Sequence, residues 1–580
     1  MKWGRELKDF LFVISSFLVF AVILRTLFLA RQIAMGDTEP PAYPVWYPPY
    51  PLGMLDFGPN TLGHNFLVEL LTPKWYTVVF TYLSFVIALF SAHWLARNMT
   101  FREKGIYSDI RLYLFPYLFA LNPPFIESFF SGDAGGVNIA ISLAPLVYLY
   151  TRQFAEKGER KYLAYLVLIE LLGNWVYIEF FFFSFYFQIP VILELAVRKD
   201  KVGVKRWVLA SIPVSSLGFF SEMDSEVLAY FNAKVMAPQI FTASIGYYAS
   251  SLAFYVIVLL ILMMSTAMIG DGKARALLAT SFLFLAAWGA FYLHGIPVPL
   301  LDAIWATFTG MSIKLVMFTL YPFLLTFLIV PNNATRSLLF VLLLLFPYSQ
   351  FATPGSFHIP DVYELAKFNA FDYQAVEGLY HVAELISESP GPSVVYAYDS
   401  RQAIQVQSAI PWVLGYLTPN LNSSFISNFT EMRLYGIKYV ISFAPLKSSY
   451  LRPLYNTSQL YLYEFVGFDG IVHLLNGTPA NYSITGGTIR VSSYPVVVAI
   501  PYSPYLTNAK PYGPATIVLA KSSMFSLYPL YRLSVFIAYL TWGISLILIV
   551  FLLKKEIISL SQRLRLSRPS RPSGATSLLR

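Results

Sequence analysis

Two acidic residues stand close together in a proline-rich stretch that directly follows the first hydrophobic segment. Residues 35–51 contain Asp37 and Glu39, separated by one threonine and followed by a run rich in Pro and Tyr. The prolines exclude a helix here, and Gly36 permits a tight turn. Carboxylates at the mouth of a membrane protein can act as a general base or as ligands. The alternative is a solvated loop with ordinary surface acids, which spacing alone favours.

The composition places these acids in a membrane protein. The chain has 580 residues, of which 56% are hydrophobic and only 13% charged, whereas soluble domains carry about 25% charge. Residues 9–30 are long enough to span a bilayer and no small-residue cleavage site follows, so a cleavable signal is not expected. Cysteine is absent, which excludes disulfides and thiolate metal sites.

The basic residues predict the orientation of the spans. The net charge of +9 lies mainly in short loops and in the tail, where the positive-inside rule would place it, so it does not indicate nucleic-acid binding. The pattern predicts roughly twelve spans, a multi-pass protein of the cell membrane and two cytoplasmic termini. The expected spans are 9–30, 75–96, 106–121, 137–151, two within 162–197, 207–221, 247–269, 275–293, 313–330, 336–351 and 533–553.

The apolar block 162–197 is too long for one span at about 1.5 Å per residue. A hairpin with its turn near Gly173 and Asn174 keeps the basic run that begins at Arg198 on the inner side, whereas a single helix would put that run outside. The hairpin is therefore the predicted structure.

The predicted fold class is mainly α, a polytopic helical membrane protein with an extracytoplasmic α/β plus β-rich domain. Residues 352–528 are polar and rich in turns and Tyr, with apolar runs at 393–398 and 437–443 that are typical of buried strands. The expected domains are a transmembrane domain at 1–351, a soluble outer domain at 352–528, and a final span with a basic tail at 529–580.

Asn-X-Ser/Thr sequons provide an independent check, because they are acceptors only on the outer side. The sequons of the predicted outer domain are Asn422, Asn428, Asn456, Asn476 and Asn481. Asn98 and Asn333 fall in predicted inner loops and should stay unmodified.

The order of several short motifs resembles the GT-C superfamily of membrane glycosyltransferases, and most of all its YfhO-type branch and the archaeal relatives. Gly36-Asp37-Thr38 precedes Tyr43-Pro44 in the first outer loop, and a second outer loop begins with Asn122-Pro123 and ends in Ser131-Gly132-Asp133. Two late motifs complete the resemblance, namely Gly436 to Ile441 and Pro501-Tyr502-Ser503-Pro504. Glu39 followed by two prolines departs from the pattern.

The resemblance implies transfer of a sugar from a polyprenyl- or dolichyl-phosphate donor to a glycan, lipid or protein acceptor on the outer face of the membrane. Asp37 is the matched residue and the expected general base, with Glu39 as the second catalytic candidate. Glu127 and Asp133 would bind sugar hydroxyls, or hold a divalent cation together with Glu39. The need for a metal stays open, because relatives differ.

Two arginines and two buried acids complete the candidates. Arg25 and Arg31 lie near the outer end of the first span and would bind the lipid phosphate, although snorkelling to headgroups explains them equally well. Glu170 and Glu179 lie in apolar helices of the predicted hairpin, as functional or structural groups.

Two other functions stay open. A transporter of lipid-linked saccharides would require charges deep in several helices and inverted repeats, and the sequence shows few such charges. A non-catalytic envelope or scaffold protein would keep the same spans and use its outer domain for binding.

Overall fold

The computed structural model describes the protein in separate stretches, and every structural statement below concerns these residues. They are 7–18, 32–34, 73–100, 106–120, 137–177, 180–224, 370–372, 394–397, 413–414, 423–457, 460–500, 505–513 and 516–559, with single positions at 59, 63, 66, 67, 70, 71, 227, 378, 381, 382, 384–386 and 502.

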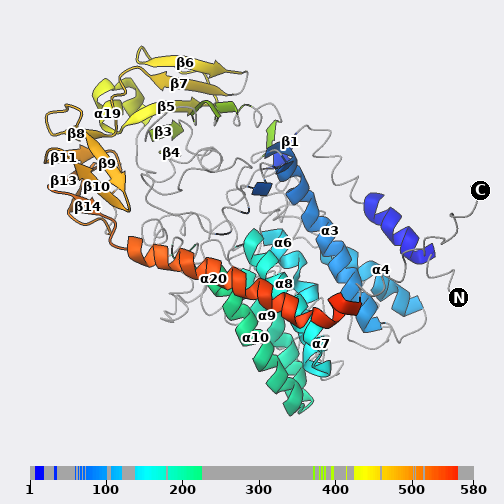
Figure 1. Ribbon diagram of the computed structural model, residues 1–580. Coiled ribbons are helices and arrows are strands. Elements are labelled where there is room, and N and C mark those ends of the chain that lie inside the picture. Colours follow the sequence, from blue (N-terminus) through cyan, green and yellow to red (C-terminus); the bar gives the residue numbers. More distant parts are fainter. Residues whose placement is uncertain are drawn as a thin grey trace, which may run out of the picture.

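The first half of the described chain is helical, and the last helix of the chain returns to it (Figure 1). The helices are α3 (Pro73–Thr100), α4 (Ile106–Ala120), α6 (Val137–Ser142), α7 (Ala144–Lys157), α8 (Arg160–Val176), α9 (Phe180–Val197), α10 (Lys201–Ser221) and α20 (Tyr528–Leu552). Residues 7–18 are also helical. Most of these helices coincide with the hydrophobic segments expected in the same regions. The span expected at 137–151 is instead divided at Leu143 into α6 and α7, and α7 continues to Lys157.

The long apolar block forms two helices, as predicted, but α8 continues through Gly173 and Asn174 to Val176, and α9 begins at Phe180. Gly173 belongs to the last turn of α8, and a Cβ there would lie 2.2 Å from Phe180 Cδ1. Asn174 is also helical, and its Oδ1 accepts a hydrogen bond of 2.8 Å from the backbone N–H of Phe181. The two residues therefore shape the turn from within α8, by close packing and by capping the start of α9.

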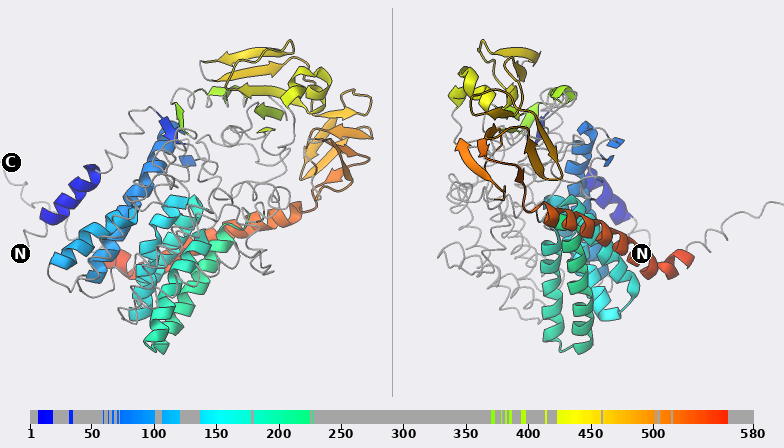
Figure 2. Two further views of the ribbon diagram at one scale, coloured as in Figure 1. Left: turned by 180° about the vertical axis from the view of Figure 1, so that it is seen from behind. Right: turned by 60° about the vertical axis from the view of Figure 1, so that its left-hand side comes forward.

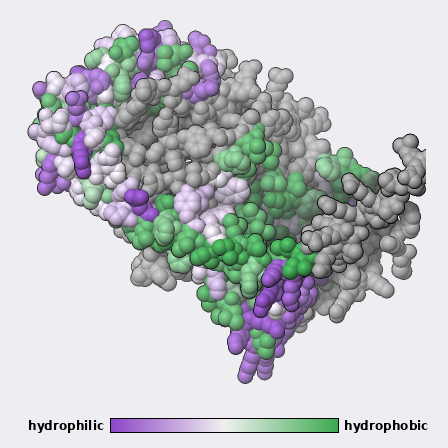
Figure 3. All heavy atoms as spheres, viewed as in Figure 1, coloured by the Kyte–Doolittle hydropathy of each residue, from purple (hydrophilic) through white to green (hydrophobic). Residues whose placement is uncertain are grey.

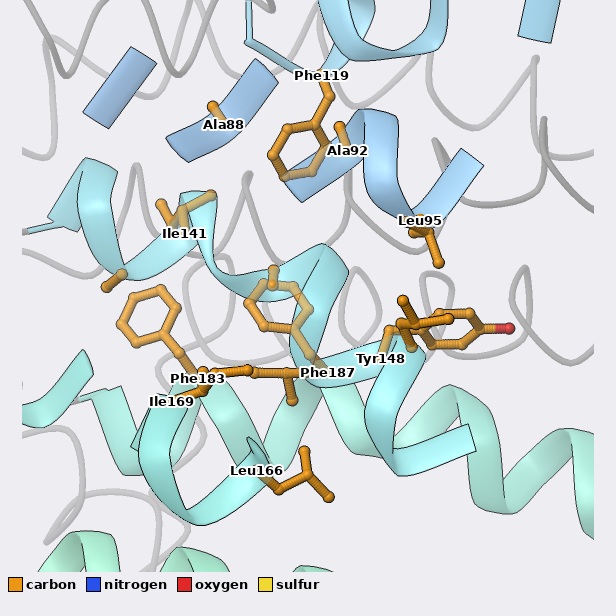
Figure 4. Packing of buried hydrophobic residues seen from close by; sticks show 14 of the residues in the cluster. Ala88, Ala92, Leu95, Phe119, Ile141, Tyr148, Leu166, Ile169, Phe183 and Phe187 are labelled. Carbon is orange, nitrogen blue, oxygen red and sulfur yellow. The ribbon is translucent and has the colours of Figure 1, made fainter. Parts of the chain in front are cut away.

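The helical core lies where α3, α4 and α6 to α9 meet (Figure 4). Phe119, Phe183 and Phe187 are at most 1% exposed and interlock between the helices. Ala88 and Ala92 of α3 are fully buried, because small side chains let helix backbones approach closely.

The last helix has an unusual distribution of residues. α20 crosses α8 and α10 (Figure 2), and it buries the small residues Ser534, Ala538 and Ser545 against the protein. Many of its large apolar side chains point outward, with Phe536 63% and Ile547 71% exposed, which produces a hydrophobic band on the surface (Figure 3). Small residues inside and large apolar residues outside are typical of a helix that faces lipid.

Two of the described helices, α9 and α20, are long and apolar enough to cross a membrane. About half of the α9 segment is buried inside the protein, compared with 22% of the α20 segment. A buried helix of a soluble core passes the same test, so these helices favour membrane association without giving the number of spans.

The second region is β-rich and contains three small sheets. A mixed five-stranded sheet has the order β4 (Val413–Leu414), β3 (Val394–Ala397), β5 (Ile437–Ser442), β7 (Tyr461–Phe465), β6 (Leu451–Asn456). Antiparallel pairing forms a sheet of β12 (Ala509–Gly513), β13 (Thr516–Leu519), β11 (Val496–Val498) and β8 (Val472–Leu474), and another of β14 (Ser523–Met524), β10 (Thr488–Val491) and β9 (Tyr482–Thr485).

This order agrees with an α/β unit followed by an antiparallel β unit. β3 pairs in parallel with β5, and the helix α19 (Phe429–Leu434) precedes β5. Gly436 joins α19 to β5 with a φ of +60°, a conformation that glycine adopts without steric strain. Tyr531 and Val535 of α20 belong to the same apolar cluster as the β strands, which attaches this region to the last helix.

Candidate functional site

The residues that the sequence predicts for catalysis and substrate binding lie outside the described residues, and their roles stay predictions. They are Arg25, Arg31, Asp37, Glu39, Glu127 and Asp133. Glu179 and the sequon residue Asn422 also lie outside them.

A short strand pair holds the chain just before the acidic loop. β1 (Gln32–Ala34) pairs antiparallel with β2 (Ala370–Asp372), with Gln32 opposite Asp372 and Ala34 opposite Ala370. β2 belongs to the segment predicted to begin the outer domain. The pairing therefore connects the end of the first predicted span to this domain, at the point where the acidic loop begins.

A buried carboxyl group lies inside the helical region, in a set of residues that we name the Glu170 cluster: Glu170 and Asn174 of α8, Ser184 of α9 and Gly218 of α10. Glu170 is 1% exposed. The Asn174 amide donates to the Glu170 backbone carbonyl at 2.8 Å and approaches Glu170 Oε1 at 3.4 Å. Ser184 faces the same carboxyl group from α9.

α10 leaves room for this carboxyl group by carrying a glycine. A Cβ at Gly218 would lie 2.2 Å from Glu170 Oε1 and 2.6 Å from Asn174 Nδ2. Within the described part of the chain, Glu170 Oε2 has no hydrogen-bond partner. A carboxyl this deeply buried is costly to ionise without a paired cation, so the cluster suits a group that binds or releases a proton rather than a permanent charge.

The opposite end of the same helices carries an ion-pair network. Glu194 of α9 has a 4% exposed side chain, pairs with Arg198 and lies 3.4 Å from Arg152 of α7. Glu156 pairs with both arginines, at 3.1 Å with Arg152 and 3.2 Å with Arg198. The two carboxylates balance the two guanidinium groups, and the network joins the ends of α7 and α9. These ion pairs therefore have a structural role.

Basic residues gather at this end of the bundle. Arg206 of α10 donates to the backbone carbonyls of Ala155 and Glu156, at 3.3 and 3.0 Å, so the start of α10 lies beside the end of α7. Figure 3 shows the lower end of the molecule as hydrophilic. The basic run that begins at Arg198 thus lies beside the end of α7.

In the β-rich region, Asp469 contacts two basic side chains, Arg433 and His473. Asp469 accepts hydrogen bonds from Arg433 of α19 at 2.7 Å and pairs with Nε2 of the buried His473 at 2.8 Å. Partial burial alone would raise the pKa of Asp469, but the hydrogen bonds from Arg433 and His473 outweigh it and lower the pKa below its usual value. These contacts tie α19 to β8.

The described sequon residues of this region are all on its surface. Asn428, Asn456, Asn476 and Asn481 are exposed. Asn428 caps α19, accepting from Thr430 N at 3.1 Å through Oδ1, which leaves its amide nitrogen available for modification. In the Asn476 sequon, the Thr478 hydroxyl donates to Asn476 Oδ1 at 2.8 Å.

Sequence reasoning found Glu170, but it took Asn174 for a turn residue and did not single out Ser184 or Gly218. Ser211, Ser215 and Gly218 recur at helical spacing along α10, and the two serines are buried. A stripe of small and polar residues in an apolar helix indicates a face that packs closely against its neighbours, and this signal could have identified α10 as the partner of Glu170. Among the described residues, no group of three potential metal ligands occurs.

Comparison with known proteins adds no relative. No protein-family model matches the chain, and a search of curated proteins finds no match.

Proposed function

We propose that this chain is an integral-membrane glycosyltransferase that moves a sugar from a polyprenyl- or dolichyl-phosphate donor to an acceptor on the outer face of the membrane. The observation that carries the proposal is the pairing of β1 with β2. Asp37 follows Ala34 by three residues, and three residues reach at most about 11 Å. Asp37 is thereby tethered to the start of the predicted outer domain, as an enzyme acting at that face requires.

The proposed topology has roughly twelve spans and two cytoplasmic termini. Three observations support it: the basic turns at one end of the helices, the outward apolar face of α20, and the exposed sequons of the β-rich region. These features separate a charged end, an apolar band and a polar domain, which is the arrangement that a bilayer imposes.

In the proposed reaction, Asp37 accepts the proton of the acceptor hydroxyl as its oxygen attacks the anomeric carbon. The bond between that carbon and the phosphate oxygen breaks, and the lipid phosphate leaves with the electron pair. Glu39, Glu127 and Asp133 orient the sugar, and carboxylate charge stabilises an oxocarbenium-like transition state. Arg25 and Arg31 bind the phosphate.

The test replaces Asp37 by Asn, which keeps the shape of the side chain and removes the base. Turnover should fall by roughly 10²–10⁴-fold, the usual contribution of a positioned base, while Glu39→Gln should have a milder effect. Glu464→Gln is the control, since Glu464 pairs with Arg452 on the surface of the β-rich region. The assay follows sugar transfer from a polyprenyl-phosphate donor, and full activity of Asp37→Asn would exclude this residue as the base.

One observation favours a transporter of lipid-linked saccharides as the second candidate. Glu170 is a buried acid inside the bundle, and such acids serve as proton relays in transporters. Proteoliposomes separate the two functions: a transporter would equilibrate a lipid-linked saccharide across the vesicle in the absence of acceptor, and Glu170→Gln would abolish this. A glycosyltransferase would consume the donor only when acceptor is present.

A further inference from the structure

An apolar groove lies between the helical segment 7–18, α3 and the start of α7. The groove is open to the surface and has a volume of about 700 Å³, within the roughly 300–1,000 Å³ that is usual for small-molecule sites. Phe12 and Leu146 form its two sides, and α3 forms its floor. Figure 1 shows the segment 7–18 beside α3 and α4.

The floor of the groove is an apolar stripe that ends in a cation. Val86, Phe90 and Trp94 of α3 recur every four residues and are 36%, 46% and 46% exposed. Arg97 follows in the last turn of α3, lines the same groove and is exposed. Within the described residues, Arg97 forms no ion pair.

Specific contacts fix the walls of the groove. The Phe12 ring stacks on His93 of α3 with a centroid distance of 4.5 Å. Asp9, which also lines the groove, accepts a hydrogen bond of 2.8 Å from the Tyr113 hydroxyl of α4. The Ser15 and Ser16 hydroxyls lie 2.6 and 3.0 Å from that of Tyr117. The groove is therefore preformed, as ligand sites usually are.

We propose that this groove binds one membrane phospholipid of the cytoplasmic leaflet, with a hydrocarbon chain along the apolar stripe and the phosphate at Arg97. Arg97 follows Val86 by eleven positions, a rise of about 16 Å in a helix and close to half of the roughly 30 Å hydrocarbon core. Arg97 lies at the basic end of the molecule, the side where anionic lipids concentrate. Trp94 lies one turn deeper, at the depth where tryptophan anchors membrane proteins.

The proposal rests on the orientation of the proposed topology and not on glycosyl transfer. Lipid retention needs no turnover. A chain that retains lipid but transfers no sugar would refute the proposed glycosyltransferase activity and leave the lipid groove intact. A chain that transfers sugar but retains no lipid would refute the lipid groove and leave the activity intact.

Native mass spectrometry of the full chain in mild detergent, titrated with phosphatidylglycerol, tests the proposal. The wild type should bind one lipid per chain. Arg97→Gln should weaken binding by about fivefold or more, the worth of one basic residue near an anionic surface. Val86→Trp should abolish binding by filling the groove from an exposed position.

Two matched controls carry the same substitutions on α10, which contributes no residue to this groove. Lys205→Gln removes a charge from an exposed position near the same end, and Val208→Trp enlarges a side chain that is 40% exposed. Both should bind lipid like the wild type. The proposal would be overturned if all four variants bound lipid equally. It would also be overturned if the wild type bound no lipid because another segment of this chain fills the groove.

Discussion

Gly218→Ala tests whether α10 must carry a glycine to accommodate the Glu170 carboxyl group. The added Cβ would lie 2.2 Å from Glu170 Oε1, 2.6 Å from Asn174 Nδ2 and 2.8 Å from Phe181 Cβ, all well inside the roughly 3.5–4.0 Å of a normal contact. Overpacking of this kind costs typically about 1–3 kcal/mol. Loss of the Asn174 cap on α9 would add about 0.5–2 kcal/mol, and the better helix propensity of alanine returns at most about 1 kcal/mol.

The expected result is a loss of about 1–3 kcal/mol in the free energy of unfolding, measured for the full chain in detergent by denaturant titration with circular dichroism. Gly543→Ala is the matched control: Gly543 lies within α20, and a Cβ there meets no atom within 4 Å. The control should be neutral or slightly stabilising, because only helix propensity changes.

A double variant separates the steric argument from a general intolerance of substitution in α10. Glu170→Ala removes the carboxyl group, so adding Gly218→Ala to it should cost about 1 kcal/mol less than Gly218→Ala costs in the wild type. Glu170→Gln keeps the size of the side chain and should give no such relief. Stability of Gly218→Ala equal to that of Gly543→Ala would refute the reasoning.

The remaining predictions concern pH, topology and modification. The pKa of Asp469 is lowered in the folded state, so its interactions stabilise the protein above the unfolded pKa of about 3.9 and are lost as the pH falls below it. Asp469→Asn should therefore reduce the difference between the melting temperatures at pH 7 and pH 3. An unchanged difference would contradict this prediction. The chain is free of cysteine, so single introduced cysteines can be labelled with an impermeant thiol reagent in intact cells. Tyr512→Cys should react and Lys201→Cys should not, although both positions are exposed on the protein surface. The reverse result would invert the proposed topology. In a host that glycosylates, Asn428→Gln should remove one glycan by mass, whereas Asn98→Gln should change nothing.

The sequence by itself determined where the described helices of the first half and the last helix of the chain lie, apart from some of their ends. A run of apolar residues longer than one span can be satisfied only by two helices, which is why the block 162–197 was correctly divided. Turn residues and β-branched runs indicated the strands at 394–397 and 437–442, because local propensity and burial agree there. The predicted acids of the outer loops lie outside the described residues, so that part of the site stays a prediction.

The tertiary structure decided how these segments meet. Gly173 and Asn174 resemble a turn in the sequence, yet they are helical, because Phe180 packs on the first and the second caps α9 from the preceding helix. The pairing of β1 with β2 joins segments more than three hundred residues apart, and the space for the buried Glu170 carboxyl group depends on a glycine in a different helix. Hydrophobic periodicity records which face of an element is buried, but it carries no information about which neighbour covers that face, and only the packed structure supplies it.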